Sequence, residues 1–363
     1  MKPLYVVGTQ RDVGKTTFCI GLIRAFQKRG LSVGYTKPLG QRVSSVAGQP
    51  VHDDALVVSQ AMGTDADHPS SMVVPLTQGR VEKEIYDLHV PELTEKVTSV
   101  CRRLRDEYDA VVVEGMGHVA MGSCLKLSSA EVARSMGARA LLISGGGIGR
   151  AIDDISLCAT FLTARGADLM GAVVNKVWPE KFNRVKDATT KGLDNLGIRS
   201  YGTVPYEDML VSPTIRQVVA QLDCAMLCGD NALDNRVGAF IVAAMEPDHM
   251  VSYLKDRVLV ITPGDRSDNI LAVLSTHVLE AEKNPVAGIV LTGGFRPPSK
   301  VINLLAGSGL PAILCREHTY TLATKLKNMT FKITPQDTER IDTAICLVEE
   351  YADVDGILAG MKE

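Results

Sequence analysis

Residues 8–17, with the sequence GTQRDVGKTT, carry the residue types that bind the phosphate groups of a nucleotide. Gly8 and Gly14 let the backbone curl around an anion, so that N–H groups and the positive end of a following helix point at phosphate oxygens. Lys15 adds a positive charge, and the hydroxyl of Thr16 is a ligand that magnesium accepts. The segment predicts a site for a phosphorylated ligand and a magnesium ion.

The elements around this loop are the ones that a phosphate-binding loop requires. Residues 4–7 are apolar and predict a buried strand, and apolar residues at helical spacing follow Lys15. A chance Gly-Lys-Thr is the alternative, and strand, loop and helix together make it the weaker one. The five residues 9–13 separate the first glycine from the Gly-Lys pair, one more than in a standard P-loop.

Apolar runs alternate with helical patterns along the first half of the chain. Because this alternation is typical of a mostly parallel sheet covered by helices on both faces, we expect an α/β fold. Ligands of such sheets gather at the carboxyl ends of the strands, where the loop, Glu114 and the glycines at 145–147 all fall. The predicted strands are residues 4–7, 32–35, 110–114, 140–144 and 172–175, and the predicted helices follow Gly14 and cover residues 54–62, 91–107 and 151–165.

The lengthened loop resembles that of dethiobiotin synthetase, of the synthetase-like domain of long bacterial phosphotransacetylases and of the cobyrinic acid amidating synthetases. Motifs similar to theirs follow in the same order, namely TKPLG at 36–40, HDDA at 52–55, VVVEGMG at 111–117 and VVN at 173–175. The resemblance implies a P-loop nucleotide-binding domain over residues 1–213, with ATP and Mg²⁺ as its ligands.

The same resemblance implies roles for individual residues. Thr16, Asp54 and Glu114 would bind Mg²⁺, Lys15 and Lys37 would act in phosphoryl transfer, and Asn175 would meet the adenine edge. A second contact to adenine is implied for the turn expected at residues 202–205. The nucleotide contacts implied in full are Gly8, Asp12, Val13, Gly14, Lys15, Thr16, Thr17, Asn175 and Pro205.

Several of these residues have structural alternatives. Asp54 could be a helix N-terminal residue stabilised by the macrodipole, and its neighbour Asp53 could be the helix cap. Glu114 ends an apolar strand, where a carboxylate is costly unless it binds something, but it could also cap the next helix. Lys37 could be a surface lysine at a proline turn, and His118 is either a general base or a solvated side chain.

The second half of the chain resembles a DRTGG domain, because two apolar runs end in TPGDR at 262–266 and TGG at 292–294. We expect this smaller α/β domain over residues 214–337, and a helical segment at 338–363 that packs on its own domain. In long phosphotransacetylases a DRTGG domain precedes the acetyltransferase domain. No acetyltransferase pattern follows here, so phosphate acetyltransferase activity is not expected of this chain by itself.

A second ligand site is predicted in the DRTGG domain, for a small-molecule effector. Arg266 and the amides of Gly293 and Gly294 would donate to an anion, and Asp265 and Thr292 complete the candidate set. The alternative is a pair of turns with a structural Asp-Arg ion pair.

Composition bears on the number of domains, the class of partner, the location and the state of the cysteines. The 363 residues are 45% hydrophobic, enough for two cores, and the interspersed charges sum to −3, which argues against nucleic-acid binding. Since no signal-peptide pattern or apolar run of membrane-spanning length occurs, we expect a cytoplasmic protein, and a homo-oligomer is a further expectation. We expect no disulfide among the eight scattered cysteines, and Cys224 and Cys228 are expected to be a reduced pair rather than zinc ligands.

Three functions fit these features. The favoured one is a regulatory or accessory protein in which ATP binding or slow hydrolysis is coupled to ligand sensing by the DRTGG domain. The alternative is an ATP-dependent ligase that activates a carboxylate or carbamate. One feature argues against the ligase function: Leu39 and Gly40 stand where the synthetases have small polar residues. A scaffold with a degenerate site is the weakest, since the phosphate and metal residues are all present.

Overall fold

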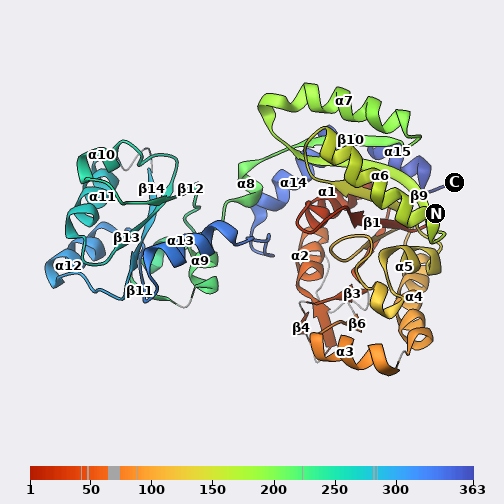
Figure 1. Ribbon diagram of the computed structural model, residues 1–363, viewed down its shortest axis with the longest axis horizontal. Coiled ribbons are helices and arrows are strands. Elements are labelled where there is room, and N and C mark those ends of the chain that lie inside the picture. Colours follow the sequence, from red (N-terminus) through yellow and green to blue (C-terminus); the bar gives the residue numbers. More distant parts are fainter. Residues whose placement is uncertain are drawn as a thin grey trace. The chain divides into compact units, whose positions relative to one another are not determined.

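The computed structural model describes residues 1–41, 43–46, 49–63, 74–87, 89–222, 224–280, 283 and 285–363. These residues form two compact units, one made of Met1–Leu210 and Ile333–Glu363 and the other of Val211–Lys332. The chain thus builds most of the first unit, then the whole second unit, and returns to the first (Figure 1).

The first unit is built on a parallel six-stranded sheet. Its strand order is β10 (Ser200–Pro205), β9 (Asp168–Val177), β8 (Arg139–Ser144), β1 (Leu4–Gly8), β7 (Ala110–Glu114) and β2 (Val33–Thr36). Two short ladders pair β3 (Leu39–Gly40) with β6 (Val74–Pro75) and β4 (Val43–Val46) with β5 (Gln49–His52).

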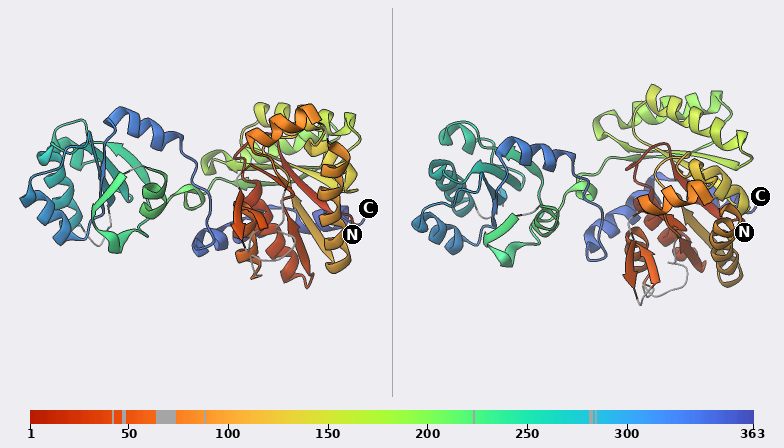
Figure 2. Two further views of the ribbon diagram at one scale, coloured as in Figure 1. Left: turned by 90° about the horizontal axis from the view of Figure 1, so that it is seen from below. Right: turned by 60° about the horizontal axis from the view of Figure 1, so that its bottom comes forward.

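Helices cover both faces of this sheet (Figure 2). One face carries α4 (Val90–Glu107), α5 (Ser129–Ser135), α6 (Gly149–Ala164) and α7 (Phe182–Asn195). The other carries α1 (Lys15–Lys28), α2 (Asp53–Met62), α14 (Thr338–Tyr351) and α15 (Val354–Gly360). Further helices are α3 (Gln78–Asp87) and α8 (Asp208–Val211), and residues Ser123–Leu125 and Pro179–Lys181 form short 3-10 helices. The predicted α/β fold with a mostly parallel, helix-covered sheet is confirmed.

The apolar runs of the sequence form central strands of the sheet, which helices cover on both faces. All five residues of β1 and of β7 are buried, which explains why these strands read as continuous apolar stretches.

The turn expected at residues 202–205 is wrong, because these residues belong to β10, where Thr203 pairs with Val174 of β9. The apolar side of α14 packs against α1 and joins the core of the first unit.

The second unit has a five-stranded sheet of its own. Its order is β11 (Cys224–Cys228), β15 (Ala312–Cys315), β14 (Val286–Thr292), β13 (Val258–Pro263) and β12 (Ala239–Val242), with β11 antiparallel to its neighbour. Its two apolar cores involve α9 (Ile215–Gln221) and α13 (Thr319–Asn328) on one side, and α10 (Pro247–Val251), α11 (Ser267–Leu279) and α12 (Ser299–Ser308) on the other. This is the predicted smaller α/β domain.

Cys224 and Cys315 form a disulfide, so the expectation of none was wrong. The antiparallel pairing of β11 with β15 sets the two residues opposite each other, with their Cα atoms 4.6 Å apart. We predict six reactive thiols in the protein unfolded without reductant and eight after reduction, counted by a chromogenic thiol reagent. Eight thiols before reduction would contradict the disulfide.

Within the described ranges, no helix has the length and apolar character needed to cross a membrane.

Candidate nucleotide site

The phosphate loop joins the carboxyl end of β1, at Gly8, to the first turn of α1, which Lys15, Thr16 and Thr17 open. Gly14 has a φ of 92°, and a Cβ there would lie 2.4 Å from Nδ2 of Asn175, so the position requires glycine.

Two side chains from β9 hold the loop. Asn175 Nδ2 donates to the carbonyl of Val13 at 2.9 Å, and Lys176 Nζ donates to the carbonyl of Asp12 at 2.6 Å. Asp12 itself has a φ of 56°, in the left-handed region. The curled conformation of the loop is therefore fixed by the protein before any ligand binds.

Lys15 is buried, and its Nζ donates to the carbonyl of Gly117 at 2.8 Å. Burial lowers the pKa of Lys15 to about 8, although the nearby Glu114 carboxylate acts to raise it. An anion beside this ammonium would offset the cost of its burial, so the position favours a bound phosphate.

Lys37 lies between the carboxylates of Asp54 and Glu114, and all three side chains are buried. Its Nζ donates to Oε1 of Glu114 at 2.6 Å and to Oδ2 of Asp54. Glu114 also accepts hydrogen bonds from Thr16 Oγ1 at 2.8 Å and from the Tyr35 hydroxyl at 2.9 Å. We call Thr16, Lys37, Asp54 and Glu114 the buried ionic cluster.

The charges of this cluster depend on one another. Burial acts to lower the pKa of Lys37, but the carboxylates of Glu114 and Asp54 outweigh it and hold the pKa above the ordinary lysine value. Since a buried charge that loses its partner is strongly destabilising, each member of the cluster is held in place by the others.

Three neighbouring elements supply the cluster. Lys37 follows the edge strand β2, Glu114 ends β7, and Asp54 lies in the first turn of α2. His52 is the N-cap residue of α2, since its Nδ1 accepts from the Asp54 amide at 3.1 Å. The Asp53 capping alternative is therefore wrong, and the Asp54 carboxylate meets Lys37 instead.

The donor set suits Mg²⁺. Hydroxyl and carboxylate oxygens from Thr16, Asp54 and Glu114 are the hard ligands that this ion prefers. In the part of the chain that the structure describes, no group of three or more His, Cys, Asp or Glu side chains is placed to hold a metal. Mg²⁺ in nucleotide sites relies on one or two carboxylates and the substrate phosphates, so the residues fit an ion that arrives with a nucleotide.

Asn175 uses both ends of its amide within the protein. Besides the Nδ2 contact to the loop, its Oδ1 accepts from the backbone amide of Lys176 at 2.9 Å. Asn175 thus positions the loop, and Pro205 lies at the end of the adjacent β10. His118 is exposed and accepts from the Ala120 amide at 3.3 Å, as a solvated turn residue does.

Sequence reasoning assigned no individual role to four contributors to this site, namely Tyr35, His52, Gly117 and Lys176, although His52 and Gly117 lie in motifs that it singled out. Tyr35 reads as an ordinary strand residue, and its contact with Glu114 depends on β2 lying beside β7. Of the four, the histidine of the HDDA motif could most easily have been found from the sequence, because it directly precedes the acidic pair.

In the second unit, the loops after β13, β14 and β15 meet. Gly264 packs so closely that a Cβ there would lie 1.7 Å from the carbonyl oxygen of Phe295. The amide of Gly293 donates to the Glu317 carbonyl at 2.8 Å, and that of Gly294 to the Cys315 carbonyl at 2.9 Å. The two amides expected to hold an anion are therefore used within the fold.

The other candidate residues of that unit have internal partners as well. Thr292 and Thr319 share a hydroxyl hydrogen bond of 2.6 Å. Arg266 forms its ion pair with Asp268, at 2.8 Å, and not with the neighbouring Asp265. Arg266 lies at the carboxyl end of the sheet, where its charge is still accessible to an anionic ligand.

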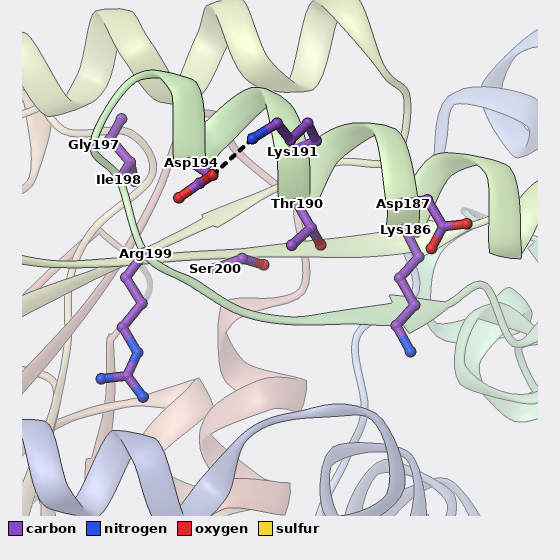
Figure 3. Close-up of a pocket in the computed structure, with 9 residues that line it drawn as sticks. All are labelled: Lys186, Asp187, Thr190, Lys191, Asp194, Gly197, Ile198, Arg199 and Ser200. Carbon is purple, nitrogen blue, oxygen red and sulfur yellow. Dashed lines mark hydrogen bonds and ion pairs between the residues drawn. The ribbon is translucent and has the colours of Figure 1, made fainter.

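A separate groove of about 650 Å³ lies between α7 and the start of β10 (Figure 3). Charged side chains from α7 line it, including Lys191 and Asp194, which form an ion pair of 3.1 Å. It shares no residue with the phosphate loop or the buried ionic cluster.

Comparison with known families matches a different family model to each half of the chain. A family model described as an AAA domain (AAA_26) matches residues 2–214. The chain belongs to this family. A second model, described as a DRTGG domain, matches residues 217–329. The predicted order of a P-loop domain followed by a DRTGG domain is confirmed.

Its relatives include phosphate acetyltransferases. That of Nitratidesulfovibrio vulgaris is 27% identical over 360 residues, covering 96% of this chain and 50% of the relative. That of Pseudomonas aeruginosa is 28% identical over 370 residues, covering 97% and 51%. The chain spans about half the length of these relatives.

Likeness to solved structures is weak. The CBS and DRTGG domains of the regulatory region of Clostridium perfringens pyrophosphatase, solved with diadenosine tetraphosphate, align with a TM-score of 0.26 and 17% identity. The match covers 32% of this chain and 46% of that one.

Proposed function

We propose that the chain binds ATP with Mg²⁺ at the phosphate loop and couples nucleotide binding, or slow hydrolysis, to ligand binding in its DRTGG domain. The observation that carries the proposal is the buried ionic cluster beside Lys15, because clusters of buried titratable groups are typical of functional sites. The role would be regulatory or accessory in metabolism, in a cytoplasmic homo-oligomer that acts without nucleic acid or membrane.

In this proposal each residue has a defined task. Lys15 and the loop amides would contact the phosphates, and Thr16, Asp54 and Glu114 would hold Mg²⁺, whose charge would offset that of the phosphoryl group. Lys37, which donates to Asp54 and Glu114, would be the cation placed to hold a transferred group beside the phosphates. Asn175 keeps the loop in its binding conformation.

The ligase alternative is favoured by one observation, the presence of Lys37 inside the cluster rather than on the surface. A cation there could hold a carboxylate or carbamate beside the γ-phosphate. Screening amines and carboxylic acids for faster ADP release tests this alternative. A consistent lack of stimulation across the screen leaves the regulatory account.

Coupling between the units is tested by hydrogen–deuterium exchange of the full chain with and without MgATP. We expect exchange to change in peptides from residues 211–332 as well as in the first unit. A change confined to the first unit would show that nucleotide binding is not coupled to the DRTGG domain.

A further inference from the structure

An aromatic pair, an exposed tryptophan and a partly buried tyrosine, follows the ends of β9 and β10. Trp178 is the single tryptophan of the chain, and 54% of its surface is exposed. Its ring packs on that of Tyr206, with the ring centroids 4.3 Å apart. We call these two side chains the aromatic shelf.

The fold fixes the shelf in place. Trp178 follows the end of β9 and Tyr206 the end of β10, which are paired parallel strands. The Tyr206 amide donates to the Val177 carbonyl at 2.7 Å, and its hydroxyl hydrogen-bonds the Asp208 carboxylate. The shelf therefore lies at the carboxyl edge of the sheet, where ligands of such folds bind.

One strand end links the shelf to the phosphate loop. Asn175 and Lys176 of β9 hold the loop at Val13 and Asp12, and Trp178 comes two residues later. At about 3.3 Å per residue, Trp178 lies roughly 10 Å along the chain from Asn175. A nucleotide whose phosphates sit in the loop can extend its base in this direction.

A nucleobase extending from the loop would need a contact other than Asn175. Asn175, which the resemblance assigns to the adenine edge, already bonds the loop carbonyl and the Lys176 amide. An indole face supported from behind by a second ring offers stacking, which every base can use because every base has a π-face.

We propose that Trp178, supported by Tyr206, is the stacking surface for the nucleobase of the bound nucleoside triphosphate. This inference rests on the proposed nucleotide binding and adds to it a residue that contacts the base. Recognition by stacking alone implies that ATP and GTP bind with Kd values within about tenfold of each other.

The test compares two ligands that share a triphosphate but differ in the base. Calorimetry of the full chain measures the Kd of MgATP and of magnesium tripolyphosphate for the wild type, Trp178→Ala and Trp178→Phe. We expect Trp178→Ala to raise the Kd of MgATP about tenfold and to leave that of tripolyphosphate unchanged, with Trp178→Phe close to the wild type. Unchanged tripolyphosphate binding also shows that the variant is folded.

The outcomes distinguish the stacking role of Trp178 from the nucleotide binding on which it rests. If the wild type binds MgATP and Trp178→Ala binds it equally well, the stacking role is wrong while nucleotide binding stands. An equal loss for both ligands also overturns stacking, because the base would not be what Trp178 contacts. If the wild type binds neither ligand, both proposals fail. Because the chain has one tryptophan, stacking should also change its intrinsic fluorescence on adding MgATP but not on adding tripolyphosphate.

Discussion

Replacing Lys15 with alanine is expected to weaken MgATP binding by about 2 to 4 kcal/mol, roughly a hundredfold in Kd. The wild-type ammonium is buried against the Gly117 carbonyl, close to the loop amides that would surround the phosphates. The variant removes the formal charge and leaves the loop, whose shape is set by Asn175 and Lys176. Calorimetry of the full chain measures the change.

A matched control is Lys191→Ala. Lys191 lies on α7, forms an exposed ion pair of 3.1 Å with Asp194, and is remote in sequence from every residue of the loop. Both variants change the net charge equally, so a general electrostatic effect would weaken binding in both. Equal affinities for the wild type and Lys15→Ala would refute the assigned role of the loop lysine.

Replacing Lys37 with methionine is expected to lower the free energy of unfolding by about 3 to 5 kcal/mol. Asp54 and Glu114 would then remain buried without the ammonium that bridges them. Mg²⁺, without nucleotide, should restore part of this loss, because a divalent cation can take the place of the ammonium between two carboxylates. Chemical unfolding in MgCl₂ and in NaCl of equal ionic strength measures both effects.

The control for this variant is Lys2→Met. Lys2 forms an exposed ion pair with Asp168 at 3.5 Å, and losing such a pair costs about 1 kcal/mol or less. Two results would count against the cluster. One is a Lys37→Met variant no less stable than Lys2→Met, and the other is an effect of MgCl₂ no greater than that of NaCl.

The sequence predicted those parts of the site that depend on local chain order. The phosphate loop is one continuous segment, and its flanking strand and helix follow from apolar runs and glycine positions. The motifs near residues 37, 54, 114 and 175 could be placed by resemblance. Their direct contacts could not, because the Lys37 bridge depends on how β2, α2 and β7 meet in space.

Elsewhere, pairing between distant segments overrode local signals. The resemblance implies a turn at residues 202–205, but pairing with β9 draws them into β10. The short strand β15 was not predicted, and with it the opposition of Cys224 to Cys315 was missed. The occupied amides of Gly293 and Gly294 likewise depend on the loop after β15.

The central claim is that the phosphate loop and the buried ionic cluster form one site for a nucleotide with Mg²⁺. Calorimetric titration of ATP into the full chain, with Mg²⁺ and then with an excess of EDTA, tests it most directly. We expect saturable binding of one ATP per chain that weakens strongly when Mg²⁺ is removed. No binding, or binding of equal strength in EDTA, would contradict the account.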